Sequence, residues 1–476
     1  MIKEFNPEDV QGNILRGYRL NLVRHLVLEV TNRTLARQFL AAAASGSTNT
    51  VPTITRESSE KWTDPPKLCF NIGVTFAGLQ ALGVTQDDLE TFPTEFRQGM
   101  AKRAAKIGDF GDSAPQNWAE PFNQPERVHL IASIYSDPDD PVEQVEQVQA
   151  QISKAFTIIG VRDGRGLPEG KVFFGYRDSI SQPRFEHVPN PTRANDNEPI
   201  NPLGTVLLGY PTHYEGILFR VPTPNELGHN GAFNAFRVLA QDTVGFEKYL
   251  SAAATELETH PDVDQLLSPG AEENIFGMKG DRHGALREVV AAQMCGRWRN
   301  GMPYEKSPNS TGPIPNTPGF LTNFDYDRGS RCPVGSHTRR ANPRNGHIVQ
   351  RMSNYSRRIV RRGMSYGPNF DPTNLDDGKD AERGLLGNFL CANLGAQFEA
   401  VMCDWVNVGL QDPDITGASD PLLGANEPET SWFDLTLANG GSIRLRGFPR
   451  FIKARGGAYT FLPSLSAIAY LSKLET

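Results

Sequence analysis

The first third of the chain alternates between short apolar runs and amphipathic stretches, a pattern typical of strands followed by helices. Apolar runs predict strands at 26–30, 68–74 and 128–135. After the first run, Thr31 or Asn32 can cap a helix, and Gly46 can end it. Apolar side chains recur every three or four residues over 142–156, which predicts a helix that packs on a sheet.

A similar rhythm returns in the second half of the chain. Residues 233–239 read as a strand, 244–250 begin a helix, and 398–406 predict a later one. We therefore expect an α+β protein with two units, each an antiparallel sheet covered by helices. Residues 186–204 and 299–320 are rich in Pro, Asn, Gly and Ser and predict long loops, which are often functional.

The length of 476 residues exceeds the usual size of one domain and favours two. No apolar run approaches the ~20 residues that span a bilayer. The N-terminus lacks the basic start and apolar stretch of a signal peptide, so we expect a cytosolic protein, with secretion left open. The five cysteines include no CxxC pair, which favours buried thiols over a zinc site or disulfides.

The net charge of −7 argues against nucleic acid as the main partner. Yet eight arginines crowd one stretch, here called the arginine-rich segment. It either meets an anionic ligand or forms a solvated surface with scattered acidic partners. Its members are Arg339, Arg340, Arg344, Arg351, Arg357, Arg358, Arg361 and Arg362.

His337 differs from the other histidines in its neighbours. Small residues precede it from Cys332 onward, and arginines follow it. One neutral imidazole can ligate the iron of a haem while cations meet the propionates, so this pairing suits haem. The alternative is a structural histidine beside arginines.

Two further segments could carry chemistry. Asp178 lies in a turn between Gly175 and Pro183, where it is either a general acid/base at a pocket mouth or a carboxylate bonded to its own backbone. Residues 357–362 alternate as a strand would, with one arginine facing inward. That arginine could stabilise negative charge on a peroxide, or the segment could be an exposed basic strand edge.

Together these segments resemble the dye-decolourising peroxidases, and the resemblance covers nearly the whole chain. The Asp178 turn is similar to the family's GxxDG motif, with Ser179 in place of the last glycine. We expect the turn to survive this change, at a cost of roughly 1 kcal/mol if φ is positive. The matching segments are 10–18, 71–79, 174–183, 296–303, 332–344 and 357–367.

The resemblance implies two ferredoxin-like units, at 1–215 and 216–476, with haem b held mainly by the C-terminal unit. It assigns His337 as the proximal iron ligand and Arg339 as the partner of a propionate. A carboxylate should lie behind His337 and make the imidazole more electron-donating. The candidates for it are Asp420, which is favoured, Glu399 and Asp404.

On the opposite side of the haem, the resemblance implies that Asp178 is the acid/base. Arg361 would be the distal arginine, with Arg358 and Arg362 as alternatives. Four other residues are expected to contact or shape the cofactor pocket: Leu386, Phe389, Ile180 and Gln182.

The implied activity is the reduction of hydrogen peroxide coupled to one-electron oxidation of bulky aromatic donors such as dyes and phenolics. A carboxylate acid/base predicts peak activity in acid. Bulky donors would be oxidised at a surface Trp or Tyr, unless these residues belong to the core. The candidates are Trp298, Trp405, Trp432 and Tyr366.

Other functions remain open at this point. A haem carrier with little peroxidase turnover would keep His337 but needs neither Asp178 nor Arg361. A haem-free binding protein would not need His337 beside the arginines, and the Gly-x-x-Asp turn argues against chlorite breakdown. We expect no membrane partner and a monomer or small homo-oligomer.

Overall fold

The computed structural model describes residues 4–46, 51–58, 62, 66–138, 142–188, 199–214, 216–275, 277–327, 329–346, 348, 355–376 and 378–474. Arg351 of the arginine-rich segment lies outside these residues. None of the helices within them is long and apolar enough to cross a membrane.

The N-terminal unit is a four-stranded antiparallel sheet in the order β4–β1–β3–β2. Its strands are β1 (Leu22–Glu29), β2 (Cys69–Val74), β3 (Leu130–Ser136) and β4 (Thr157–Arg165), and its crossover helices are α1 (Arg33–Ser45) and α5 (Val142–Ile152). The α1 limits follow the sequence signals: Asn32 Oδ1 accepts from Leu35 N at 3.0 Å, and Gly46 has φ +64°.

The C-terminal unit repeats this strand order as β10–β5–β7–β6. Its strands are β5 (Ala232–Gln241), β6 (Val360–Tyr366), β7 (Gly384–Cys391) and β10 (Ile452–Leu462). In both units the fourth strand pairs with the first, and the third lies between the first and the second. The predicted pair of ferredoxin-like units is thereby confirmed.

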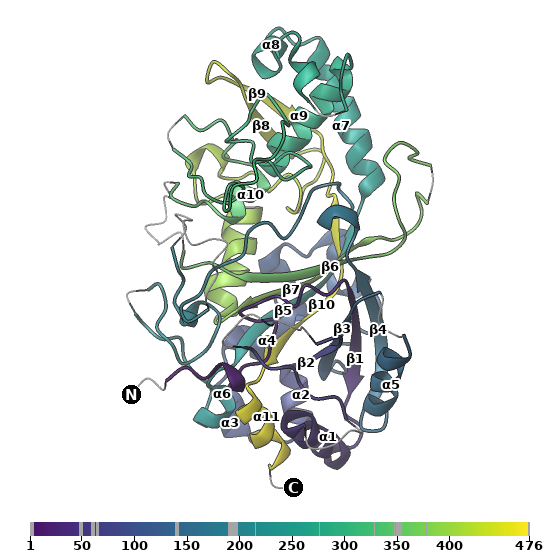
Figure 1. Ribbon diagram of the computed structural model, residues 1–476, viewed down its shortest axis with the longest axis vertical. Coiled ribbons are helices and arrows are strands. Elements are labelled where there is room, and N and C mark those ends of the chain that lie inside the picture. The colour runs from purple at the N-terminus through teal and green to yellow at the C-terminus, as the bar shows by residue number, and fades with distance from the viewer. Residues whose placement is uncertain are drawn as a thin grey trace.

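The two sheets join at both edges into a closed eight-stranded barrel (Figure 1). Phe461 of β10 pairs with Val74 of β2, and Arg165 of β4 pairs with Ser365 of β6. The boundary at 215/216 falls between β4 and β5 and stays a prediction.

Long connections of the C-terminal unit form a second lobe beyond the barrel (Figure 1). This lobe has its own apolar core, which includes Phe246, Leu286, Trp298 and Phe433. Between β5 and β6 lie α7 (Thr243–Glu258), α8 (Val263–Leu266), α9 (Arg282–Cys295) and α10 (His337–Ala341). Between β7 and β10 lie the π-helical turns η9 (Leu394–Glu399) and η10 (Val401–Asn407) and the hairpin of β8 (Trp432–Thr436) and β9 (Ser442–Arg446).

The remaining helices are short. They are α2 (Phe76–Ala81), α3 (Gln86–Glu90), α4 (Thr94–Lys102), α6 (Asn225–Gly228) and α11 (Leu465–Ser472), with 3₁₀ turns at Pro7–Asp9, Ala104–Ile107, Gly111–Ser113, Pro115–Asn117, Pro168–Gly170, Leu203–Thr205, Ala271–Asn274 and Pro413–Ile415.

Candidate functional site

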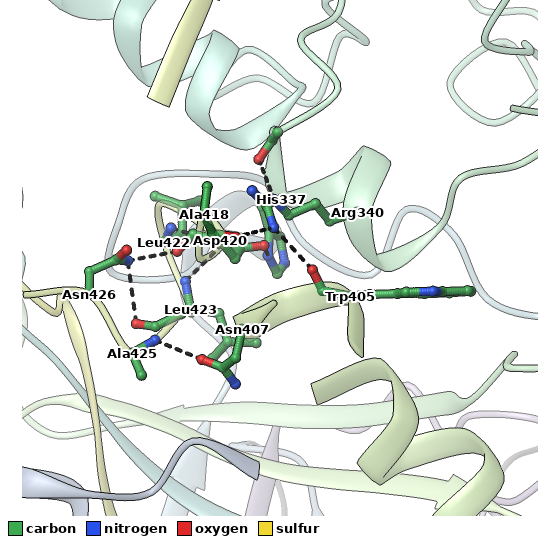
Figure 2. A network of polar contacts seen from close by, with 12 residues as sticks. His337, Arg340, Trp405, Asn407, Ala418, Asp420, Leu422, Leu423, Ala425 and Asn426 are labelled. Carbon is green, nitrogen blue, oxygen red and sulfur yellow. Dashed lines mark hydrogen bonds and ion pairs between the residues drawn. The ribbon is translucent and has the colours of Figure 1, made fainter. Parts of the chain in front are cut away.

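His337 is the first residue of α10 and lies against a buried carboxylate (Figure 2). Its Nδ1 is 2.9 Å from Oδ2 of Asp420. The other carboxylate oxygen of Asp420 accepts from the backbone N–H groups of Leu422 and Leu423, each at 2.9 Å. The Asp420 side chain is fully buried, whereas that of His337 is 28% exposed. The imidazole is therefore fixed through Nδ1, which leaves Nε2 available as a ligand atom.

Charged side chains shift the pKa of His337 in opposite directions. Burial alone would lower the pKa of His337, but the Asp420 carboxylate raises it above its usual value. Asp178 acts in the same direction, and Arg361 opposes it. Asp178 and Arg361 therefore both act on the pKa of His337, in opposite directions.

The other two carboxylates considered for the place behind His337 have other partners. Glu399 is buried in an ion pair with Arg103 and accepts from the Tyr459 hydroxyl at 3.0 Å. Asp404 pairs with Arg357 Nη2 at 2.8 Å. Of the three, Asp420 is the one that contacts His337.

The Asp178 loop is tied to the strand that carries Arg361. Gln182 donates from Nε2 to the carbonyl of Arg361 at 2.8 Å and accepts at Oε1 from its backbone N–H at 3.1 Å. The Arg361 guanidinium donates to the carbonyl of Ser181. Asp178 is held by its own backbone N–H, which donates to the carbonyl of Gly170 at 2.8 Å. Asp178 and Arg361 are both exposed.

The turn survives with serine, as expected. Ser179 has φ +58°, a left-handed conformation that costs an L-residue about 1 kcal/mol. Ile180 follows and packs on Gly301, where a Cβ would lie 2.7 Å from its Cδ1. Ile180 therefore braces the loop against the segment after α9.

Strand pairing corrects one predicted pocket residue. Arg361 pairs with Phe389 across β6 and β7, so their side chains share a face. Leu386 lies three positions before Phe389, on the opposite face, and is fully buried in the barrel core. The residues beside Phe389 on its face are Leu385 and Gly387, and a Cβ at Gly387 would lie 2.5 Å from Cε2 of Phe389. Alternate residues of a strand share a face, so Leu385 and Gly387 could have been predicted from the position of Phe389 in the sequence.

Most of the described arginines of the arginine-rich segment contact other parts of the protein, so neither an anionic ligand nor a solvated surface accounts for the segment as a whole. Arg340 donates to the carbonyls of Gly335, Trp405 and Ala418. Arg344 and Arg362 likewise donate to backbone carbonyls, and Arg357 pairs with Asp404. Arg339 is half-buried, donates to the carbonyl of Cys332 and lies 4.8 Å from the ring centre of Tyr326.

Two of the four surface aromatic candidates belong to the core. Trp298 and Trp405 are each 1% exposed. Trp432 is partly exposed beneath Arg444, and the partly exposed Tyr366 donates to Glu382 at 3.0 Å. Only the latter two can meet a donor at the surface.

The residues fit a haem. Among the described residues no three His, Cys, Asp or Glu side chains gather to hold a metal ion. A single histidine such as His337 can ligate an iron whose other ligands come from a porphyrin. Its Nδ1 has the carboxylate partner that ligating histidines usually have. Phe389 and Leu385 would supply an apolar wall on the face of Arg361, and Arg339 would supply a cation for a propionate.

The chain is also similar to known haem peroxidases over nearly its full length. Residues 9–166 match the model of the DyP dimeric alpha+beta barrel domain. Dye-decolorizing peroxidase msp1 of Mycetinis scorodonius is 27% identical over 97% of this chain and 87% of its own. The chain is similar to dye-decolourising peroxidases over nearly its full length. It is accordingly a haem-dependent peroxidase.

Further dye-decolourising peroxidases show the same similarity. The Multifunctional dye peroxidase DyP2 of Amycolatopsis sp. is 27% identical over 98% of this chain and 95% of its own. A solved dye-decolorizing peroxidase in complex with 2,6-dimethoxyphenol superposes with a TM-score of 0.79 and 25% identity, covering 98% of this chain and all of that one.

Proposed function

We propose that this chain reduces hydrogen peroxide at a haem b held by His337, with Asp178 and Arg361 acting on the peroxide. The aromatic donors are phenols and dyes, oxidised by one-electron steps. The observation that supports the proposal is the pair of hydrogen bonds by which Gln182 ties the Asp178 loop to Arg361, together with the effect of both charges on the pKa of His337. A haem carrier needs neither a carboxylate nor a guanidinium at this position.

The residues on the His337 side would bind the haem and set how strongly the imidazole donates electrons to its iron. His337 would ligate iron through Nε2, while Nδ1–H donates to Asp420 and keeps the imidazole in that tautomer. Arg339 would meet a propionate. When bound, the haem supplies the iron at which the O–O bond of the peroxide is cleaved.

The distal residues handle protons and charge. Asp178 takes a proton from the near oxygen of the peroxide and delivers it to the leaving oxygen, which departs as water. The Arg361 guanidinium stabilises negative charge on the peroxide as this proton moves. The Gln182 contacts hold the loop and the strand together, so both groups stay in register.

Donors too bulky for the site would be oxidised at the surface. Tyr366 and Trp432 remain as candidates, and Tyr366 lies on the same strand as Arg361. The cytosolic location and the oligomeric state stay predictions.

The test is an absorption titration with haem, followed by stopped-flow mixing with hydrogen peroxide at acidic and neutral pH. Asp178→Asn should bind haem normally and react with peroxide about 10²–10⁴ times more slowly. Glu169→Gln, in the exposed turn beside Gly170, is the matched control and should react like the wild type. Equal rates for Asp178→Asn and wild type would refute the role of Asp178, and a wild-type spectrum unmoved by peroxide would favour the carrier.

A further inference from the structure

The loop that carries Asp178 is held at its base by one arginine of the second lobe. Arg299 lies in the segment after α9 and donates from Nη1 to the carbonyl of Phe174. Its own backbone carbonyl accepts from the N–H of Arg177 at 2.9 Å. The side chain and the backbone of a single residue therefore hold the loop at two points, four residues and one residue before Asp178.

Two carboxylates on two different helices fix the direction of the Arg299 guanidinium. Glu247 of α7 contacts Nη2 at 2.9 Å, and Glu288 of α9 accepts from Nε at 3.1 Å. The guanidinium is a rigid planar fork, so these two contacts also set where Nη1 points, which is toward Phe174. Glu247 is itself buried, and its second oxygen pairs with Arg287 at 2.8 Å.

The loop is shaped to receive this side chain. Gly175 has φ +82°, and a Cβ there would lie 2.8 Å from Nη1 of Arg299. The guanidinium carbon lies 5.5 Å from the ring centre of Tyr176, within the range of a cation–π contact. The Tyr176 hydroxyl donates to the carbonyl of Ala291 in α9 at 2.7 Å. These contacts join the base of the loop to α7 and α9 through Arg299.

We propose that Arg299 is a positioning residue that sets the place of the Asp178 carboxylate through the base of its loop. This inference rests on the proposed function, in which Asp178 takes a proton from the peroxide and returns it. Because Asp178 is exposed, its place depends on the backbone that carries it. Gln182 ties the far side of the loop to Arg361, and Arg299 supplies the attachment on the near side.

The size of the expected effect follows from the geometry that proton transfer requires. The carboxylate must come within hydrogen-bond reach of the oxygen whose proton it takes. A misplacement of ~1 Å, caused by a change away from the reacting atoms, can cost about 10²-fold in rate. Release of the loop base in an Arg299 variant should therefore slow the reaction with peroxide without removing Asp178.

A matched control lies in the same lobe. Arg282 of α9 also contacts two carboxylates and one backbone carbonyl, which belong to Asp264 at 2.7 Å, Glu272 at 3.6 Å and Leu267 at 3.0 Å. Its side chain is 30% exposed, against 20% for Arg299. Its partners belong to α8 and the residues after it, so Arg282→Ala removes similar contacts elsewhere in the lobe.

The experiment uses the haem-loaded protein and two measurements. Stopped-flow absorption gives the rate with hydrogen peroxide, and hydrogen–deuterium exchange reports on residues 170–183. Arg299→Ala should react about 10²-fold more slowly and exchange faster in 170–183. Arg299→Lys keeps a cation between Glu247 and Glu288 and should recover most of the rate. Arg282→Ala should match the wild type in both measurements.

A double variant tests whether Arg299 acts through Asp178. If Arg299 only positions that carboxylate, adding Arg299→Ala to Asp178→Asn should slow the reaction little beyond Asp178→Asn alone. Two losses that multiply would show that Arg299 acts elsewhere and would overturn the proposal. A wild-type rate in Arg299→Ala, or an equal loss in Arg282→Ala, would overturn it as well.

Glu288→Gln decides the matter if Arg299→Ala does not fold. It replaces one carboxylate partner with an amide of the same shape, so it should speed exchange in 170–183 and lower the rate by less than Arg299→Ala. A wild-type rate and wild-type exchange in this variant would then overturn the proposal. If the wild type shows no absorption change with peroxide, the proposed function fails, while the exchange data still show whether Arg299 holds the loop.

Discussion

The two ferredoxin-like units share one strand order but differ in the segments that connect the strands. In the N-terminal unit the crossovers carry α1 and α5, whose apolar sides cover the sheet. In the C-terminal unit the segment from β5 to β6 carries His337, and the segment from β7 to β10 carries Asp420. The repeated sheet is the scaffold, and the proposed chemistry lies in the connections of one copy.

The two faces of the strands β6 and β7 also differ in what they contribute. The face of β6 and β7 that presents Arg361 and Phe389 borders the proposed site, and the other face, with Arg362 and Leu386, belongs to the barrel interior. Asp178 comes from the chain between the two units. Substitutions in the covering helices should therefore change stability, and substitutions in the long connections should change haem chemistry.

The largest expected effect tests the helices that cover the N-terminal sheet, which should act only as scaffold. Leu40 of α1 is fully buried, so Leu40→Ala should lower the free energy of unfolding by about 2–5 kcal/mol. Chemical denaturation of the apoprotein measures this loss. Leu35→Ala, at a 42% exposed position of the same helix, should stay within about 0.5 kcal/mol of the wild type. A changed haem spectrum in folded Leu40→Ala would break the comparison, since this helix should not influence the site.

The next largest effect tests the role of the long C-terminal connections in haem binding. Asp420→Asn removes the charge behind His337 and leaves the amide beside two backbone N–H donors, so haem affinity should fall about 10–100-fold. Haem titration followed at the Soret band gives the affinity, and a spectroelectrochemical titration should show a higher iron reduction potential. Asp404→Asn alters a nearby carboxylate that pairs with Arg357 and should leave both unchanged. Equal losses in the two variants would mean that Asp420 acts only through general packing.

Local signals explain how much of this molecule could be predicted. Asn32 and Gly46 set the limits of α1 because capping and left-handed φ are properties of a few neighbouring residues. The positions of His337, Asp178 and Arg361 came from short motifs for the same reason. Asp420 could be named only as one of three carboxylates, since its contact with His337 spans 83 residues.

The errors came from features that tertiary packing decides. Leu386 and Phe389 are separated by three positions, so a strand cannot present both to one pocket. The arginine-rich segment suggested an anion, yet Arg340 and Arg344 satisfy buried carbonyls that composition does not reveal. Trp298 and Trp405 are indistinguishable from surface tryptophans until their neighbours are known.

The smallest expected effect concerns Ser179, in the turn that carries Asp178 between β4 and β5. Ser179 has φ +58°, so Ser179→Gly should relieve left-handed strain and raise the free energy of unfolding by up to about 1 kcal/mol, reduced somewhat by the greater freedom of glycine in the unfolded chain. Denaturant titration of the apoprotein checks the sign. Ser181→Gly, two residues on and without a positive φ, should instead lower stability by about 0.5–1 kcal/mol. Destabilisation by both changes would show that the Ser179 hydroxyl outweighs the strain, and that the family's glycine has been replaced for a contact within the loop that carries Asp178.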